Sequence, residues 1–236
     1  MISSVHRADT RGVGEHGWLQ SRHTFSFAEY HDPERMGFGA LRVLNDDIVA
    51  PGAGFGRHAH ANMEIVSVPL AGALRHNDST GSTQLIRQGE VQIMSAGTGI
   101  THSEYNASDT ESVNFLQIWV MPKQRDIEPR YGQQEFPAAA RENGFQTVVA
   151  PDADDGAVWI NQDAWFSLAN FNAGNGDSYR LNRDGNGVYL FVIEGAVMIA
   201  DERLERRDGM GITESDSIDI QAGADCQLLI IEVPLD

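Results

Sequence analysis

Both the fold and the chemistry of this chain are indicated by the segment Gly56-Arg57-His58-Ala59-His60, which is complemented further on by Thr101-His102-Ser103-Glu104. Successive side chains of a β-strand point to opposite faces, so His58 shares a face with His60. For the same reason His102 shares a face with Glu104. If the two strands lie side by side in a β-barrel, three imidazole nitrogens and one carboxylate converge on one point. This arrangement predicts a metal site.

The predicted ligand set is borderline in character and suits Fe, Mn, Co, Ni, Cu or Zn. Four protein ligands leave one or two coordination positions for water, substrate or O2. A single His-X-His pair also occurs by chance on surface strands, and it is the second ligand pair that favours a bound metal here. The chain has 8 histidines, all at or before His102. Any site built from histidines must therefore lie in the first half.

The composition is typical of a soluble, turn-rich globular protein. The 236 residues suffice for one large domain or two small ones, each with its own core. The sequence is 41% hydrophobic and 22% charged, with 24 Gly and 8 Pro, which argues against disorder. A net charge of -17 would repel a phosphate backbone, so we expect no direct nucleic-acid binding.

The single cysteine, Cys226, cannot form an internal disulfide, and its apolar neighbours predict a packed, inert thiol. Residues 1–20 contain no apolar block resembling a secretory signal. Apolar runs long enough to span a bilayer are also absent from the sequence. We therefore expect a cytoplasmic protein without a membrane partner.

Short strand-like segments separated by Gly, Pro, Asn and Asp turns follow one another through the first half. The segment Trp18–Phe27, in which Thr24 and Ser26 alternate with Phe25 and Phe27, predicts a short strand with one apolar face. Further strands are expected at 38–44, 47–49, 63–68, 73–76, 83–86, 90–94 and 113–121. Pro137 and Gly144 frame a predicted short helix within a linker. The whole pattern predicts an all-β fold of antiparallel sandwich or barrel type.

The second half repeats the layout of the first at an offset of about 120 residues, which indicates two copies of one β module. The matching pairs are Ile65–Leu74 with Tyr189–Val197, Gln88–Gln92 with Asp208–Ile212, and Ala96-Gly97 with Ala222-Gly223. The copy reads Ser178-Tyr179-Arg180-Leu181-Asn182 where the His-X-His pair should fall. We therefore expect one metal in the first barrel and a structural second barrel.

These residues resemble the two sequence motifs of the cupin superfamily, and more narrowly those of the pirin-like bicupins. The first motif comprises Gly52, His58, His60, Glu64 and Gly72, and the second comprises Gly89, Ser95-Ala96-Gly97, His102 and Asn106. The first has one residue more than usual before Gly72. The second has Ser95 in place of Pro and a longer spacing before His102. Both departures are typical of pirin-like proteins, whose signature is also resembled by Met94–Tyr105, Trp18–Phe27 and Gln117–Pro122.

The resemblance implies two tandem cupin barrels of the jelly-roll or double-stranded β-helix type. Residues 1–132 would form the metal-binding barrel and residues 133–236 a barrel without metal ligands. It implies one divalent transition metal, with iron as the first choice and Mn, Co, Ni, Cu or Zn as alternatives. The implied ligands are His58, His60, His102 and Glu104.

Three further polar residues of the first half need an assignment. Glu64 is an even number of residues from His58 and His60, so strand alternation would place it on their face. The matching glutamate is itself the ligand in many other cupins. We favour Glu104 as the ligand and expect Glu64 to orient a histidine ring through its outer nitrogen. His76, on the adjoining strand, is expected not to bind the metal, and His23 is expected to be a hydrogen-bonded structural histidine.

The resemblance also implies an activity, that of a metal-dependent dioxygenase similar to quercetin 2,3-dioxygenase. Its partners would be a small aromatic substrate, such as a flavonol or a similar enol or phenol, and O2. Glu104 would be the catalytic base that accepts the substrate's hydroxyl proton. The alternative is a metal-responsive regulatory protein that acts through a protein partner, and a third possibility is a catalytically silent binder of sugars or small acids.

Overall fold

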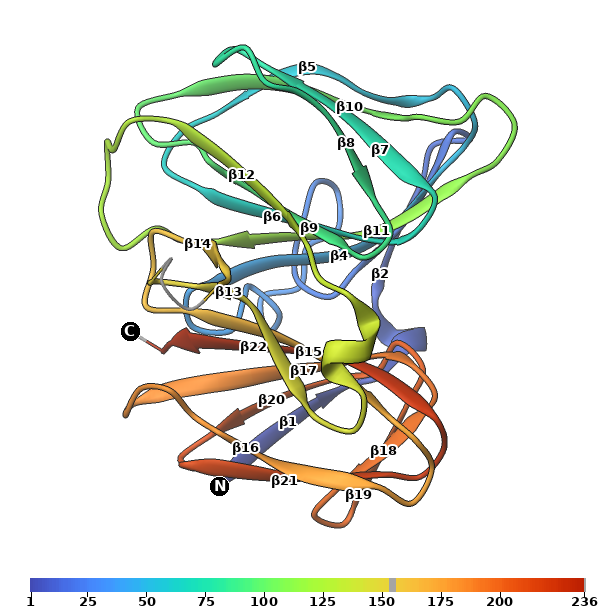
Figure 1. Cartoon of the computed structure of the whole chain (residues 1–236), viewed down its shortest axis with the longest axis vertical. Helices are drawn as coiled ribbons and strands as arrows, with labels where there is room; N and C mark the ends of the chain where they lie inside the picture. The colour runs from blue at the N-terminus through green and yellow to red at the C-terminus, as the bar shows by residue number, and fades with distance from the viewer. Residues whose placement is uncertain (153–155, 236) are drawn as a thin grey trace.

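The computed structural model describes residues 1–152 and 156–235, and within these ranges the chain forms two stacked β-barrels. Each barrel combines one seven-stranded sheet with one four-stranded sheet (Figure 1). The strand pairs are antiparallel, with one short parallel exception between residues 149–150 and 158–159. The all-β, two-barrel architecture predicted from the sequence is confirmed.

The first barrel contains the histidine-bearing strands. Its seven-stranded sheet has the order β12 (Arg130–Glu135), β9 (Glu90–Ser95), β6 (Glu64–Ala71), β11 (Val113–Val120), β4 (Leu41–Val49), β3 (Leu19–His23) and β2 (Gly12–Glu15). Its four-stranded sheet has the order β5 (Gly54–His60), β10 (Ile100–Asn106), β7 (Ala73–Asp78) and β8 (Thr83–Arg87).

The second barrel repeats this arrangement. Its seven-stranded sheet has the order β1 (Ile2–His6), β20 (Gly209–Thr213), β17 (Asn186–Glu194), β22 (Cys226–Pro234), β15 (Trp165–Phe171), β13 (Phe145–Ala150) and β14 (Val158–Trp159). Its four-stranded sheet has the order β16 (Gly176–Arg180), β21 (Ser217–Ala222), β18 (Ala196–Ile199) and β19 (Glu202–Glu205). β16 therefore takes the place of the histidine strand β5, as the sequence repeat predicts.

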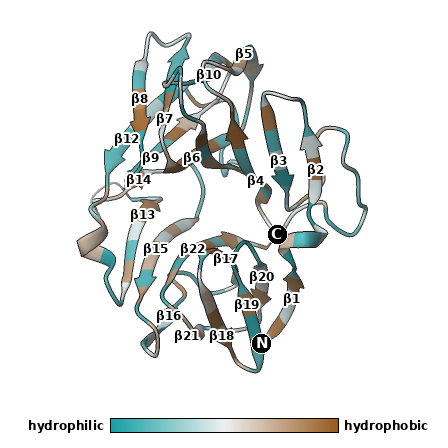
Figure 2. Cartoon of the chain, turned by 90° about the vertical axis from the view of Figure 1, so that its right-hand side faces the viewer, coloured by the Kyte–Doolittle hydropathy of each residue, from teal (hydrophilic) through white to brown (hydrophobic). Residues whose placement is uncertain are grey.

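The two seven-stranded sheets pack against each other between the barrels. One continuous apolar cluster includes Val66 and Leu116 of the first sheet together with Phe166 and Leu229 of the second. Strands such as β6 and β17 are consequently covered on both faces, which explains their nearly unbroken apolar sequences. Figure 2 shows these apolar strands near the middle of the molecule.

The interiors of the two barrels differ. The second barrel is filled by one apolar cluster that includes Leu190, Val197, Ile218 and Ile230. The first barrel has two smaller clusters, one around Phe115 and the other including Met94 and packed against Trp119. The space between those clusters is where the polar site is found.

A glycine turn shows that the two barrels share one construction. Gly72 connects β6 to β7 with a φ of 76°, and Gly195 connects β17 to β18 with a φ of 81°. A Cβ atom on Gly195 would lie 2.0 Å from the carbonyl oxygen of Asp225, so a larger residue would strain the turn. The match of Ala96-Gly97 with Ala222-Gly223 is wrong, because Ala96-Gly97 precedes β10 whereas Ala222 is the last residue of β21, the strand that corresponds to β10.

Three other segments differ from expectation or bear on the domain boundary. The strand predicted within Trp18–Phe27 is β3, but it ends at His23, and residues 24–27 form a loop in which Thr24, Phe25 and Ser26 are all buried. The predicted helix at 137–144 is only a short 3-10 turn, η2 (Ala138–Arg141). A second 3-10 turn, η1, covers Ala8–Thr10. Two observations bear on the domain boundary expected between residues 132 and 133. Strand β1 pairs with β20 of the second barrel, and residue 132 lies inside β12 of the first barrel. None of the helices in the described ranges has the length and apolarity needed to cross a membrane.

Candidate metal centre

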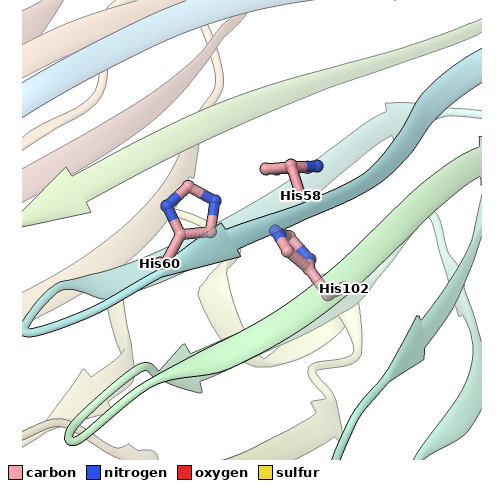
Figure 3. Close-up of side chains that lie close together, drawn as sticks. All are labelled: His58, His60 and His102. Atoms are coloured by element: carbon pink, nitrogen blue, oxygen red, sulfur yellow. The ribbon is translucent and has the colours of Figure 1, made fainter.

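Three histidines from two neighbouring strands meet at the inner surface of the first barrel. His58 and His60 lie on β5, and His102 lies on β10 directly opposite His58. One ring nitrogen from each lies within 4.8 Å of the other two. Figure 3 shows the three rings converging from the two strands. The structure thus brings together the three histidines that the alternation of strand faces predicts.

A local irregularity in β5 shapes this cluster. His102 pairs with His58 and Glu104 pairs with Phe55, so four residues of β5 lie opposite three of β10 and β5 carries a bulge. The ring Nδ1 of His58 lies 2.7 Å from the carbonyl oxygen of Gly56 within the bulge. Since a carbonyl oxygen only accepts, Nδ1 carries the proton and Nε2 is left with a free lone pair. His58 is therefore held in the tautomer that a metal requires at Nε2.

His102 provides the test of whether the cluster fits a metal. Both of its ring nitrogens are buried and have no hydrogen-bond partner. A neutral imidazole has one donor and one acceptor, and leaving each unmet costs about 1–3 kcal/mol. The pKa of His102 is lowered to about 3, mainly by burial and to a smaller extent by the nearby His58, His60 and His76. The ring is thus neutral at physiological pH, as a metal ligand must be, and the unmet nitrogen fits a cation between the rings.

His60 is the third member of the histidine cluster and lies beside Trp119. Its ring packs against Trp119 at a centroid distance of 4.9 Å. Burial lowers the pKa of His60 to about 4, and the neighbouring His58 adds to the shift. His60 therefore also offers a neutral nitrogen at neutral pH.

Glu104 lies beside this cluster and deeper in the barrel. Its carboxylate accepts a hydrogen bond of 2.8 Å from Gln117 Nε2 and one of 3.2 Å from Ser67 Oγ. A ligand atom of Glu104 groups with His76 and His102, rather than with all three of the clustered histidines. Burial raises the pKa of Glu104, while the charge of His76 opposes that effect.

His76, which was expected not to bind the metal, lies close to the histidine cluster. Its Nε2 lies 2.9 Å from Asp78 Oδ2, and its Nδ1 is buried without a hydrogen-bond partner. The His76 ring stands 5.3 Å from the ring of His102, centroid to centroid. The structure therefore provides two overlapping groups, His58–His60–His102 and His76–His102–Glu104, that share His102.

Glu64 does not orient a histidine ring, so this part of the prediction is wrong. The Glu64 carboxylate accepts hydrogen bonds from Ser95 Oγ at 2.7 Å and from the backbone N–H of Asn161 at 3.2 Å. Asn161 lies between β14 and β15, two strands of the second barrel. Glu64 thus ties the two barrels together, and Gly56 orients His58 in its place.

A cavity of about 400 Å³ opens onto the three histidines and Glu104. Trp18, Phe27, Phe55 and Trp119 contribute aromatic walls, and Ser21, His23, Asn45, Asp47 and Gln117 contribute polar ones. Within the described ranges, no other residues form a possible metal-ligand group besides the two in this barrel.

Two of the cavity residues have roles that the sequence did not reveal. His23 lines the cavity with an unpartnered Nδ1, so the structure does not support its expected hydrogen-bonded role at that nitrogen. Asn45 also lines the cavity, with a buried and unpartnered Oδ1. The sequence offered no signal for Asn45, because Asn45 and Asp46 fall between the strands predicted at 38–44 and 47–49.

Comparisons with known proteins agree with this geometry. The family model for pirin matches residues 5–120, and the model for the quercetinase C-terminal cupin domain matches residues 147–233. The chain is 43% identical over 234 residues to the quercetin 2,3-dioxygenase of Escherichia coli K12, covering 98% of each chain. It is 41% identical over 225 residues to a pirin-like protein of Caulobacter vibrioides, covering 95% of this chain and 96% of that protein.

A solved structure shows the same fold with a metal. The bacterial pirin YhhW of Escherichia coli, crystallised in complex with nickel(II), superimposes with a TM-score of 0.94 at 40% identity, covering 100% of both chains. The strand order, the histidine cluster in the first barrel and the two family models all lead to one assignment. This chain belongs to the pirin family of bicupins.

Proposed function

We propose that this protein is a metal-dependent dioxygenase that acts on a flavonol or a similar aromatic enol or phenol with O2. The observation that carries the proposal is His102, whose two buried nitrogens lack partners in a three-histidine cluster facing an aromatic-walled cavity. The proposed metal ligands are His58, His60, His102 and Glu104. Relatives named quercetin 2,3-dioxygenase, at about 40% identity over nearly the whole chain, support the reaction class.

The resident metal is proposed to be one divalent transition metal. Histidine nitrogens and a carboxylate accept iron, manganese, cobalt, nickel, copper or zinc, and metal availability decides among them. Iron is our first candidate, and the nickel(II) complex of the Escherichia coli relative makes nickel the second. A metal held here would supply Lewis acidity toward a substrate hydroxyl and redox chemistry toward O2.

Glu104 is the proposed base for the substrate hydroxyl. Because burial raises its pKa, its carboxylate holds a proton more firmly than an exposed glutamate would. Gln117 donates to Oε2 at 2.8 Å and Ser67 donates to Oε1 at 3.2 Å. These two contacts fix the orientation of the carboxylate, and each oxygen retains lone-pair capacity to receive the proton.

The cavity walls position a flat ring system and keep water away. Trp18 and Phe55 pack edge to face at a centroid distance of 5.2 Å, and Phe27 packs similarly against Trp119 at 5.3 Å. Such paired rings form stiff apolar surfaces between which an aromatic substrate can lie. Exclusion of water favours proton transfer to Glu104 and reaction with O2 over competing hydrolysis.

The experiment begins with metal-free protein loaded separately with Fe(II), Mn(II), Co(II), Ni(II) or Cu(II). O2 uptake and flavonol loss are then followed together. We expect at least one metal to give coupled consumption of O2 and flavonol, and the His102→Ala variant to lose it. If none of the reconstituted forms consumes either compound, the dioxygenase proposal is wrong. Elemental analysis of protein purified without added metal identifies the resident ion.

A further inference from the structure

A row of polar side chains crosses the seven-stranded sheet of the first barrel. Directly opposite one another, strand by strand, stand His23 on β3, Asn45 on β4, Gln117 on β11 and Ser67 on β6. Residues directly opposite in neighbouring strands point to the same face. This face is the barrel interior, because Gln117 and Ser67 both bind Glu104 there.

The two halves of this row differ in how their polar atoms are used. Gln117 and Ser67 hold Glu104 and belong to the proposed metal centre. Asn45 is only 2% exposed and His23 only 5%, yet Asn45 Oδ1 and His23 Nδ1 have no hydrogen-bond partner. Both residues line the cavity. Buried polar atoms are nearly always paired, so these two indicate a group that enters the cavity and bonds to them.

The second barrel treats the matching positions differently. The corresponding strands of the second barrel, β17, β22, β15 and β13, carry two rows, Leu190–Ile230–Ser167–Thr147 and Val192–Leu228–Ala169–Phe145. Leu190, Ile230, Val192 and Leu228 belong to the apolar cluster that fills that barrel. In the first of these rows, however, the strands that match β4 and β3 carry Ser167 and Thr147, whose hydroxyl oxygens lie 3.5 Å apart. The polar pair of the second barrel is thus partnered within the protein, whereas Asn45 Oδ1 and His23 Nδ1 in the first barrel are not.

The register fixes how far this pair lies from the metal centre. Neighbouring strands are about 4.8 Å apart. Asn45 therefore lies about 5 Å from Gln117, and His23 lies about 10 Å from it, along the sheet. A fused two-ring or three-ring aromatic molecule spans this range when one end is at Glu104 and the other lies over β3 and β4.

We propose that Asn45 and His23 bind a hydroxyl group at the end of the substrate remote from the metal, so that the preferred substrates are aromatic molecules hydroxylated at both ends. This inference rests on the proposed function, because it takes the cavity to hold an aromatic substrate. A hydroxyl group suits both partners, since it donates to Asn45 Oδ1 and can either donate to or accept from His23 Nδ1.

The electrostatics of the cavity favour a neutral hydroxyl over a carboxylate. The described residues that line the cavity include no lysine or arginine, whereas they include Asp47 and Glu104. A substrate carboxylate would therefore be buried without a countercharge from the side chains around it. Burial also lowers the pKa of His23, with His16 and the nearby arginines adding to the effect, so its ring is neutral at physiological pH.

The test compares two ligands that share the metal-binding end. Quercetin carries hydroxyl groups at both ends of its ring system, whereas 3-hydroxyflavone has only the 3-hydroxyl beside the 4-keto group. Dissociation constants are measured without O2, by calorimetry on nickel-loaded protein, for wild type, Asn45→Leu and His23→Phe. The matched control is Asn170→Leu on β15 of the second barrel, the strand that corresponds to β4. Metal content and unfolding temperature verify that each variant is folded.

We expect wild type to bind quercetin at least tenfold more tightly than 3-hydroxyflavone. Each cavity variant should weaken quercetin binding by about tenfold, the effect of one lost hydrogen bond that leaves a partner unpaired. Binding of 3-hydroxyflavone should stay the same or improve, and Asn170→Leu should change neither constant. Equal shifts for both ligands, no shift, or no binding of quercetin by wild type would overturn the inference. If the variants lose quercetin affinity selectively but the protein turns over no flavonol, the proposed function is wrong and the inference about Asn45 and His23 is supported.

Discussion

Asp47 provides the sharpest test of how the cavity affects stability. Asp47 lies on β4, is only 3% exposed and accepts a hydrogen bond from Ser21 Oγ. Burial raises its pKa from the ordinary 3.8 to about 7; the Ser21 hydrogen bond opposes this, and the charges of Asp46 and Glu104 add to it. The buried carboxylate is thus expensive to ionise, and replacing it with a neutral amide should remove that cost.

The sign and the pH range follow from the two pKa values. Because the folded-state pKa is raised, the folded protein binds more protons than the unfolded chain between pH 3.8 and about 7. The stability contribution of Asp47 is therefore fully present below pH 3.8 and is lost as pH rises through about 7. The difference between the pKa values corresponds to about 4 kcal/mol as an upper bound. Since the surroundings relax around a buried charge, we expect roughly 1–3 kcal/mol.

The perturbation is Asp47→Asn, which keeps the shape and leaves an oxygen that can accept from Ser21. Urea unfolding of metal-free protein is measured from pH 4 to pH 8.5. Above pH 7.5 the variant should be more stable than wild type by roughly 1–3 kcal/mol, and this advantage should shrink steadily toward pH 4. The control is Asp219→Asn, which alters an exposed aspartate that accepts a bond from Ser178 on neighbouring strands. An advantage for Asp47→Asn that did not vary with pH, or a loss above pH 7.5, would refute the reasoning.

Three further predictions concern the metal centre and the junction between the barrels. His102→Ala should lower the bound metal, measured by elemental analysis, from about one ion per chain to nearly none, because both possible ligand groups in the barrel contain His102. Gln117→Leu removes the 2.8 Å bond to Glu104 and should weaken metal affinity by about 10- to 100-fold in a competitive chelator titration; unchanged affinity would mean that Glu104 is not a ligand. Arg207→Met removes the 2.9 Å ion pair with Asp46 across the barrels and leaves Arg11, at 3.7 Å, as the remaining countercharge of that carboxylate. It should lower the free energy of unfolding by roughly 1–3 kcal/mol in urea, an effect that 0.5 M salt should not abolish because both side chains are buried.

The sequence could predict the histidine cluster because strand geometry depends on local spacing. Alternation along a strand places His58 with His60 whatever the rest of the fold does. The pairing of β5 with β10 then needed only two strand-like segments of suitable length. The two-barrel layout was equally readable, since the glycine turns at Gly72 and Gly195 recur after similar apolar strands.

The position of Glu104 within the site could not be read in the same way. Alternation correctly places it on the face of β10 that carries His102. The bulge in β5 and the contacts with Ser67 and Gln117 on the opposite sheet decide how close it comes to His58 and His60. Those contacts join residues distant in sequence, and the spacing of residues in one segment carries no information about them.

The segment at residues 24–27 shows a second limit of local patterns. Its alternating Thr, Phe, Ser and Phe residues are typical of a half-buried strand. The chain instead leaves the sheet after His23, and the backbone N–H of Ser26 bonds to the carbonyl oxygen of Arg35 within the loop. Phe25 then packs against His6 and Tyr189 of the second barrel. Tertiary contacts between the barrels thus override the local preference.

The contrast between the two barrels explains how one module can hold a costly site. The first barrel keeps unpartnered polar atoms on His102, Asn45 and His23 and a cavity in place of a filled core. Each of these features lowers stability by an amount of the order of 1 kcal/mol or more. The second barrel has the apolar interior that the first lacks, and the cluster between the barrels packs it against the sheet that carries the polar row. The structural barrel therefore stabilises the sheet from behind, so the residues facing the cavity can be selected for binding and not for packing.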